Sequence, residues 1–151
     1  MISGVVLRKL SPICDERGFL MEIQRVDWES FAGFGQAYIT TAYPGIIKAW
    51  HAHRDQTDNF CVLRGMAKVV LYDGREDSST KGEINEFFFG ESNFGLLTIP
   101  PQVMHGFKNI GTDAVVILNL PNRLYNYEGP DEIRLPFDTD EIPYRWKPVN
   151  R

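Results

Sequence analysis

Short strand-like segments separated by turn residues run through most of this chain and constrain its fold more than any other feature. Runs of β-branched, aromatic and aliphatic residues are broken by Gly, Pro, Asn and Asp, and helical periodicity is almost absent. Residues 27–31 are the one candidate for a turn or two of helix. The predicted strands are residues 4–10, 19–25, 36–42, 46–52, 58–64, 66–73, 84–90, 95–99, 105–109 and 114–121.

About ten short strands at this spacing predict an all-β sandwich or barrel, and a barrel leaves no strand edge exposed. The dipeptide Arg64-Gly65 predicts a tight turn between two of the strands. A chain of 151 residues has the length of one domain, so we expect a single domain over residues 1–151. Residues 120–151 are rich in Pro, Asn and Asp, which predicts an irregular segment that wraps the surface.

Composition excludes several classes of partner. The net charge is −4 and no basic stripe is present, which argues against nucleic acid. No apolar run approaches the length of a membrane span, and the N-terminus lacks the apolar stretch of a signal peptide. Cys14 and Cys61 lie far apart in sequence, so we expect two reduced thiols in a cytoplasmic protein.

The three histidines form the most informative polar pattern. His51 and His53 are two residues apart, and residues i and i+2 of a strand point to the same face. Both side chains can therefore face a barrel interior, where Asp58 and His105 can join them. Three imidazoles and a carboxylate suit Zn, Fe, Mn or Ni, so a divalent transition metal is one hypothesis. Polar residues of a pocket wall without metal are the other.

The spacing of these residues resembles the two sequence motifs of the cupins. In the first motif Asp stands where Glu is usual, and in the second Gln stands where Gly is usual. The first set is Gly45, His51, His53, Asp58 and Gly65, and the second is Pro100, Gln102, His105 and Asn109.

A longer resemblance covers nearly the whole chain. The stretches DERGFLMEI, GIIKAWH, VLRGMAKVVLYDGR, IPPQVMHGF and EIRLPFDTDEIPYRW occur in that order, with Gln36 between the first two. Together they resemble the dTDP-4-dehydrorhamnose 3,5-epimerase family (RmlC-like), as a compact branch. The resemblance implies an all-β fold of the cupin type, a double-stranded β-helix or jelly roll with few or no helices.

It also implies a reaction. Family members act on a nucleotide-linked 4-keto-6-deoxy sugar, whose C4 ketone acidifies the C–H bonds at C3 and C5. A base removes such a proton, an enolate forms, and a proton returns on the other face. This chemistry requires a base, an oxyanion stabiliser and an acid, and no cofactor.

The resemblance assigns roles residue by residue. His51 holds the position of the catalytic base, and Asp138 or Thr139 falls where an aspartate pairs with that base. Arg17 and Glu22 match residues that contact the nucleotide from a neighbouring subunit, which implies a homodimer with sites built from both chains. The candidate substrate contacts are Arg17, Glu22, Gln36, Lys48, His53, Asp58 and His105.

Two catalytic positions depart from the family. Asp58 stands where the family has a lysine that stabilises the C4 oxyanion, and Lys48 is a candidate to supply that charge instead. Leu124 stands where the family has the tyrosine that acts as general acid. Tyr125 is the next residue, and Tyr127 follows Tyr125 by two residues. Tyr125 is therefore the candidate acid.

These departures leave alternatives open. A 3-epimerase or a 3,4-ketoisomerase of the same sugars is one, because ketoisomerases of this fold also carry an H-A-H sequence like that of residues 51–53. A metal-binding cupin with His51, His53, Asp58 and His105 as ligands is another. A binder of sugar nucleotides without catalysis is the third.

Overall fold

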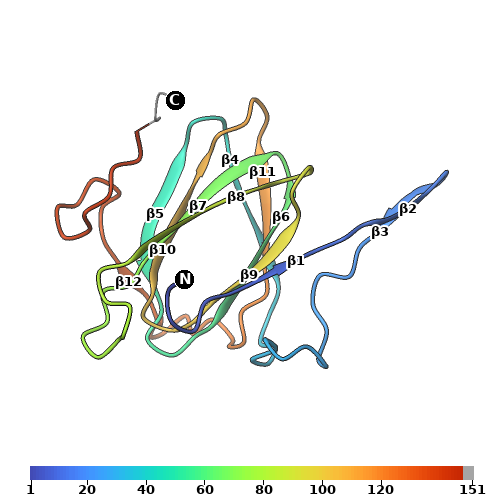
Figure 1. Cartoon of the computed structure of the whole chain (residues 1–151). Helices are drawn as coiled ribbons and strands as arrows, with labels where there is room; N and C mark the ends of the chain where they lie inside the picture. The colour runs from blue at the N-terminus through green and yellow to red at the C-terminus, as the bar shows by residue number, and fades with distance from the viewer. Residues whose placement is uncertain (148–151) are drawn as a thin grey trace.

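The computed structural model describes residues 1–147, which form β-strands and no helix (Figure 1). The first five-stranded antiparallel sheet contains, in spatial order, β1 (Val6–Lys9), β9 (Gly95–Ile99), β6 (Asp58–Arg64), β11 (Val115–Asn119) and β4 (Tyr38–Ala42). The second contains β12 (Ile133–Arg134), β5 (Ile47–Ala52), β10 (Met104–Asn109), β7 (Met66–Tyr72) and β8 (Ile84–Gly90). The all-β jelly roll expected from the sequence is confirmed.

Strand predictions from turn residues were accurate where a turn is tight. Gly65 has a φ of 77°, and β6 ends and β7 begins on either side of it. The prediction of a helical turn at residues 27–31 was wrong. The backbone there makes two isolated turns, with Trp28 N–H donating to Arg25 and Phe31 N–H donating to Trp28.

A hairpin of β2 (Ile13–Asp15) and β3 (Gly18–Leu20) projects away from the two sheets (Figure 1). Its first strand was not predicted. Every residue of both strands is exposed, including the apolar side chains Ile13, Phe19 and Leu20. The hairpin therefore makes little contact with the body of its own chain.

The space between the two sheets holds the main core. Inward-facing residues alternate along each strand, as expected for sheets that pack face to face. The largest of these buried side chains include Phe60, Val62, Leu71, Leu97, Ile99, Phe107 and Ile117. One end of this interior is apolar, and the histidines lie at the other.

The segment after β11 covers the outer face of the second sheet. Trp50 on β5 packs against Trp146 with ring centroids 5.0 Å apart, and Ile142 joins the same apolar cluster. Leu135 holds the segment to β5 through two backbone hydrogen bonds with Trp50. Among residues 120–147 the structure contains one strand, β12, which was not predicted from the sequence.

An irregularity in β5 determines which of its side chains reach the interior. His105 of β10 lies opposite His51, but Phe107 lies opposite Lys48, so β5 has one residue more than β10 over this interval. The bulge lets Lys48 and His51 face the same side although they are three residues apart. At Gly106, between the paired residues, an added Cβ would lie 2.3 Å from that of Ala49.

Candidate active site

A cavity of about 940 Å³ opens between β4 of one sheet and β5 of the other. Its lining includes polar groups suited to binding or proton transfer, among them Gln36, Tyr38, Lys48, His51, Glu132 and Arg134. Lys48 donates a hydrogen bond to Thr40 at 3.0 Å, which steers its ammonium group along the cavity wall. The cavity therefore combines cations at its opening with imidazoles deeper in.

The three histidines come together as the sequence predicted. The ring of His51 lies 4.0 Å from that of His105 and 5.8 Å from that of His53, measured between centroids. Burial, followed by the neighbouring His105 imidazole, holds the pKa of His51 well below its ordinary value. His51 is therefore a neutral imidazole at pH 7.

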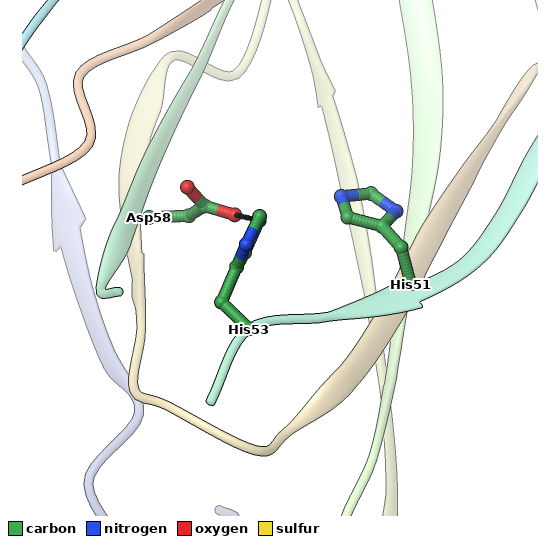
Figure 2. A group of neighbouring side chains, drawn as sticks. All are labelled: His51, His53 and Asp58. Atoms are coloured by element: carbon green, nitrogen blue, oxygen red, sulfur yellow. Dashed lines mark ion pairs between the residues drawn. The ribbon is translucent and has the colours of Figure 1, made fainter. Parts of the chain in front are cut away.

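Asp58 enters the cluster from the opposite sheet, at the start of β6 (Figure 2). Its Oδ2 lies 3.2 Å from Nε2 of His53 and 3.1 Å from Nε2 of His105. Burial favours the protonated carboxyl, but the two histidines outweigh it and hold the pKa of Asp58 well below its usual range. These three atoms are buried and make no aligned hydrogen bond.

The remaining polar side-chain atoms of Asp58, His53 and His105 all have hydrogen-bond partners. Oδ1 of Asp58 accepts hydrogen bonds from Gln56 at 2.8 Å and from Asn119 at 2.9 Å. Nδ1 of His105 lies 2.9 Å from the carbonyl oxygen of Val103, and Nδ1 of His53 faces the carbonyl oxygen of Asp131. A carbonyl only accepts, so both Nδ1 atoms carry a proton, and a ring that is neutral then has a bare Nε2. Burial lowers the pKa of His53, but the Asp58 carboxylate outweighs burial and raises that pKa above its ordinary value, which favours a proton on Nε2 of His53 as well.

Asp131, which was not predicted from the sequence, fixes the turn that follows His53. Its carboxylate accepts the backbone N–H groups of Arg54, Asp55 and Gln56 at 2.8, 3.0 and 3.2 Å. The residue joins the segment after β11 to the turn that follows His53. Sequence patterns gave no signal for it, because its contacts are to backbone groups far away in the chain.

The remaining predicted site residues lie in three places. Gln36 and Tyr125 line the cavity, where the Gln36 side chain accepts a hydrogen bond from the Tyr125 backbone at 3.3 Å. Arg17 lies on the projecting hairpin and pairs with Asp15, outside this cavity. Glu22 pairs with Arg25 at 2.6 Å, also outside it.

Asp138, predicted as the partner of the base, is exposed and is not among the residues that line the cavity. The imidazoles of His105 and His53 are instead the ring neighbours of His51. Sequence reasoning missed Tyr38, Glu132 and Arg134 as lining residues. Tyr38 was within reach, because it follows Gln36 by two residues and shares its strand face.

The fold is that of an RmlC-like cupin. At 22% identity the structure superposes on that of dTDP-4-dehydrorhamnose 3,5-epimerase from Elizabethkingia anophelis with a TM-score of 0.82, covering 98% of this chain and 84% of the other. A model of the polysaccharide biosynthesis C-terminal domain matches residues 13–133. The chain belongs to that family.

Relatives similar over their whole length carry related descriptions. The spore coat polysaccharide biosynthesis protein SpsL of Bacillus subtilis is 44% identical over 146 residues, 97% of each chain. The probable low-salt glycan biosynthesis epimerase Agl13 of Haloferax volcanii is 43% identical, over 96% of this chain and 94% of its own. A dTDP sugar isomerase from Desulfovibrio desulfuricans G20 has a crystal structure with a TM-score of 0.91 at 34% identity, covering 99% and 94%.

No segment of residues 1–147 forms a helix that is long and apolar enough to cross a membrane.

Proposed function

We propose that this chain is an epimerase that acts on a nucleotide-linked 4-keto-6-deoxy sugar, with His51 as the base. The observation that carries the proposal is the neutral imidazole of His51 in the wall of a cavity that also presents Lys48 and Arg134. A base must be unprotonated to act, and burial keeps His51 in that form. Full-length relatives described as an epimerase and a dTDP sugar isomerase support the same class of enzyme.

The reaction proceeds by proton exchange next to the ketone. His51 removes the proton from C3 or C5, and the electrons of that C–H bond form an enolate whose charge lies on the C4 oxygen. Lys48 and Arg134 are the cations of the cavity wall that can stabilise this charge, since Asp58 stands where the family has lysine. Re-formation of the ketone and protonation at carbon complete the exchange, which requires no cofactor.

The assembly that fits this proposal is a homodimer. Arg17 and Glu22 lie outside the cavity of their own chain, and the hairpin that carries Arg17 projects outward with exposed apolar side chains (Figure 1). In a dimer the hairpin reaches the partner's cavity and Arg17 contacts the nucleotide there. We also propose that residues 1–151 act as one cupin domain in the cytoplasm, with residues 120–147 as its outer wrap; the last four residues of the predicted wrap, 148–151, lie outside the described residues.

Deuterium incorporation tests the function directly. The purified protein is incubated with dTDP-4-keto-6-deoxyglucose in D2O, and NMR follows C3 and C5. We expect deuterium at one or both carbons, and a loss of about 100-fold or more in the exchange rate in His51→Asn. Absence of exchange with the wild-type protein would sink the proposal for this sugar, and the product formed separates epimerisation from 3,4-ketoisomerisation.

A metal-binding cupin is the second candidate, and the placement of the histidine nitrogen atoms favours it. Two Nε2 atoms face one carboxylate oxygen, an arrangement that calls for a cation between them, either a proton or a metal ion. Ligands of a tetrahedral zinc ion lie about 3.3 Å apart, close to these separations. A metal-ligating histidine also commonly donates its other N–H to a backbone carbonyl, as His53 and His105 do.

The donor set therefore fits a divalent transition metal, with His51, His53 and Asp58 offering ligand atoms within 4.8 Å of one another and His105 beside Asp58. Such an ion would supply positive charge near the developing oxyanion. Elemental analysis of protein purified without added metal decides whether a metal ion or a proton lies between these groups. Less than about a tenth of an equivalent, with no rise after incubation with Zn, Fe or Mn, excludes the metal site.

A further inference from the structure

Tyr38 lies across the cavity from His51. It is the first residue of β4, at the edge of the first sheet, whereas His51 lies on β5 of the second sheet, and both side chains line the same cavity. We propose that Tyr38 is a catalytic residue that delivers a proton to the substrate on the face opposite His51. The proposal rests on the proposed epimerase function and adds the identity of the acid.

The hydrogen bonds of Asn119 show that the Tyr38 hydroxyl acts as an acceptor toward the protein. The backbone N–H of Asn59 donates to Oδ1 of Asn119 at 3.0 Å, which fixes the orientation of the buried amide. Nδ2 of Asn119 therefore points the other way and donates to the Tyr38 hydroxyl oxygen at 2.8 Å. Tyr38 is the acceptor in this contact, so its own O–H proton remains available to a substrate in the cavity.

The same amide joins Tyr38 to the histidine cluster. Nδ2 of Asn119 also donates to Oδ1 of Asp58 at 2.9 Å. Burial, followed by the charge of Asp58, raises the pKa of Tyr38 above its ordinary value. Tyr38 thus carries its proton at neutral pH, as an acid must.

The other tyrosines of the cavity are less firmly held. Tyr125 and Tyr127 line it from the loop after β11, and Tyr127 is 89% exposed. Tyr38 and Tyr125 are equally exposed, at 40%, but the backbone of Tyr38 pairs with Asn119 within the sheet. A proton donor on a strand holds its position more accurately than one on a loop.

In the proposed reaction each proton that leaves one group is taken up by another. His51 takes a proton from carbon, and the electron pair of that bond forms the enolate. The enolate carbon then takes the proton of the Tyr38 hydroxyl on its other face, which restores the ketone and leaves a phenolate beside imidazolium. Asn119 donates to the phenolate oxygen, and exchange of one proton each with water resets both residues.

Two measurements on one sample test the assignment: deuterium entry at the exchanging carbon of unreacted substrate, and formation of the inverted sugar. In Tyr38→Phe we expect inversion to fall by about 100-fold or more, because the acid is lost, while deuterium entry through His51 falls by less than about 10-fold. His51→Asn loses both. Tyr43→Phe is the matched control, since Tyr43 is 77% exposed beyond the end of β4, and it retains both rates.

Thermal melting and dTDP binding of Tyr38→Phe establish that the variant is folded. Inversion within threefold of wild type in Tyr38→Phe overturns the assignment while leaving the epimerase function standing. Loss of inversion in Tyr125→Phe with retention in Tyr38→Phe assigns the acid to the loop and overturns it as well. If the wild-type protein shows neither exchange nor inversion, the proposed function fails and this assignment fails with it.

Discussion

Asp58 and Asp73 are both buried carboxylates with pKa values held below the usual range, but their surroundings differ. Asp73, after β7, accepts hydrogen bonds on both oxygens, from the Arg75 guanidinium and from the hydroxyls of Ser78 and Thr80. Asp58 has one oxygen satisfied by two amides and the other facing the Nε2 atoms of two imidazoles without an aligned hydrogen bond. Because both oxygens of Asp73 accept hydrogen bonds, Asp73 stabilises its loop. Because Oδ2 of Asp58 makes no aligned hydrogen bond, Asp58 remains available for chemistry.

The largest effect on stability is expected at Asp73. In Asp73→Asn an amide N–H2 replaces one carboxylate oxygen and faces donors, and the partly buried charge of Arg75 loses its anionic partner. We expect a loss of about 3 kcal/mol in the free energy of unfolding and a fall of roughly 6–12 °C in Tm. Calorimetry measures this, with Asp77→Asn, exposed in the same loop, as control. A Tm within 2 °C of wild type would remove the contrast between the two carboxylates.

The contribution of Asp73 also depends on pH. Hydrogen bonds from Arg75, which outweigh burial, lower the folded-state pKa of Asp73 below its value of about 3.9 in an unfolded chain. The stabilisation is therefore complete above about pH 4 and is lost as the pH falls toward the folded-state value. Urea midpoints should show a constant difference between wild type and Asp73→Asn from pH 8 to 5. The difference should shrink below pH 4, and a constant gap down to pH 2.5 contradicts this account.

Asp58→Asn should behave in the opposite way. The new amide keeps an oxygen for Gln56 and Asn119 and turns its N–H2 toward the two Nε2 atoms. Without the carboxylate that raises the pKa of His53, the neutral rings accept from this amide. We expect less than about 1 kcal/mol of change in unfolding free energy, together with slower deuterium exchange. A fall in Tm of more than about 8 °C accompanied by loss of bound metal would instead identify Asp58 as a metal ligand.

The smallest effect concerns backbone strain. In the loop supported by Asp73, the residue with positive φ is a glycine, Gly82. Near the histidine cluster it is Gln102, with φ of 65°. The Gln102 N–H donates a hydrogen bond to the His53 carbonyl at 2.7 Å. Gln102→Gly should relieve strain and stabilise the protein by about 0.5–1 kcal/mol. Gln102→Ala keeps the strain and is the control. An equal gain in both variants contradicts the explanation.

Much of the fold could be predicted from local signals. Alternating patterns and the Arg64-Gly65 turn located the long strands, because those signals lie within a few residues of each other. β12 was missed because it has two residues and is held by its pairing with β5. The apparent helical turn at residues 27–31 failed because a stretch that short does not sustain a helix.

The site could be predicted only in part. The spacing of His51 and His53 along one strand indicated a shared face, and motif spacing added Asp58 and His105. The bond from Asn119 to Tyr38 and the contacts of Asp131 depend on how distant segments face each other. No spacing in the sequence encodes that arrangement.

Trp50 gives the molecule a natural optical reporter. It occupies the strand position before His51 and packs, on the other face of β5, against Trp146 and Tyr144. One of the three tryptophans in the chain therefore shares a strand with the base, and a second packs against it. Any displacement of β5 as a ligand enters the cavity changes the surroundings of this indole pair, so intrinsic fluorescence can follow binding in solution without a label.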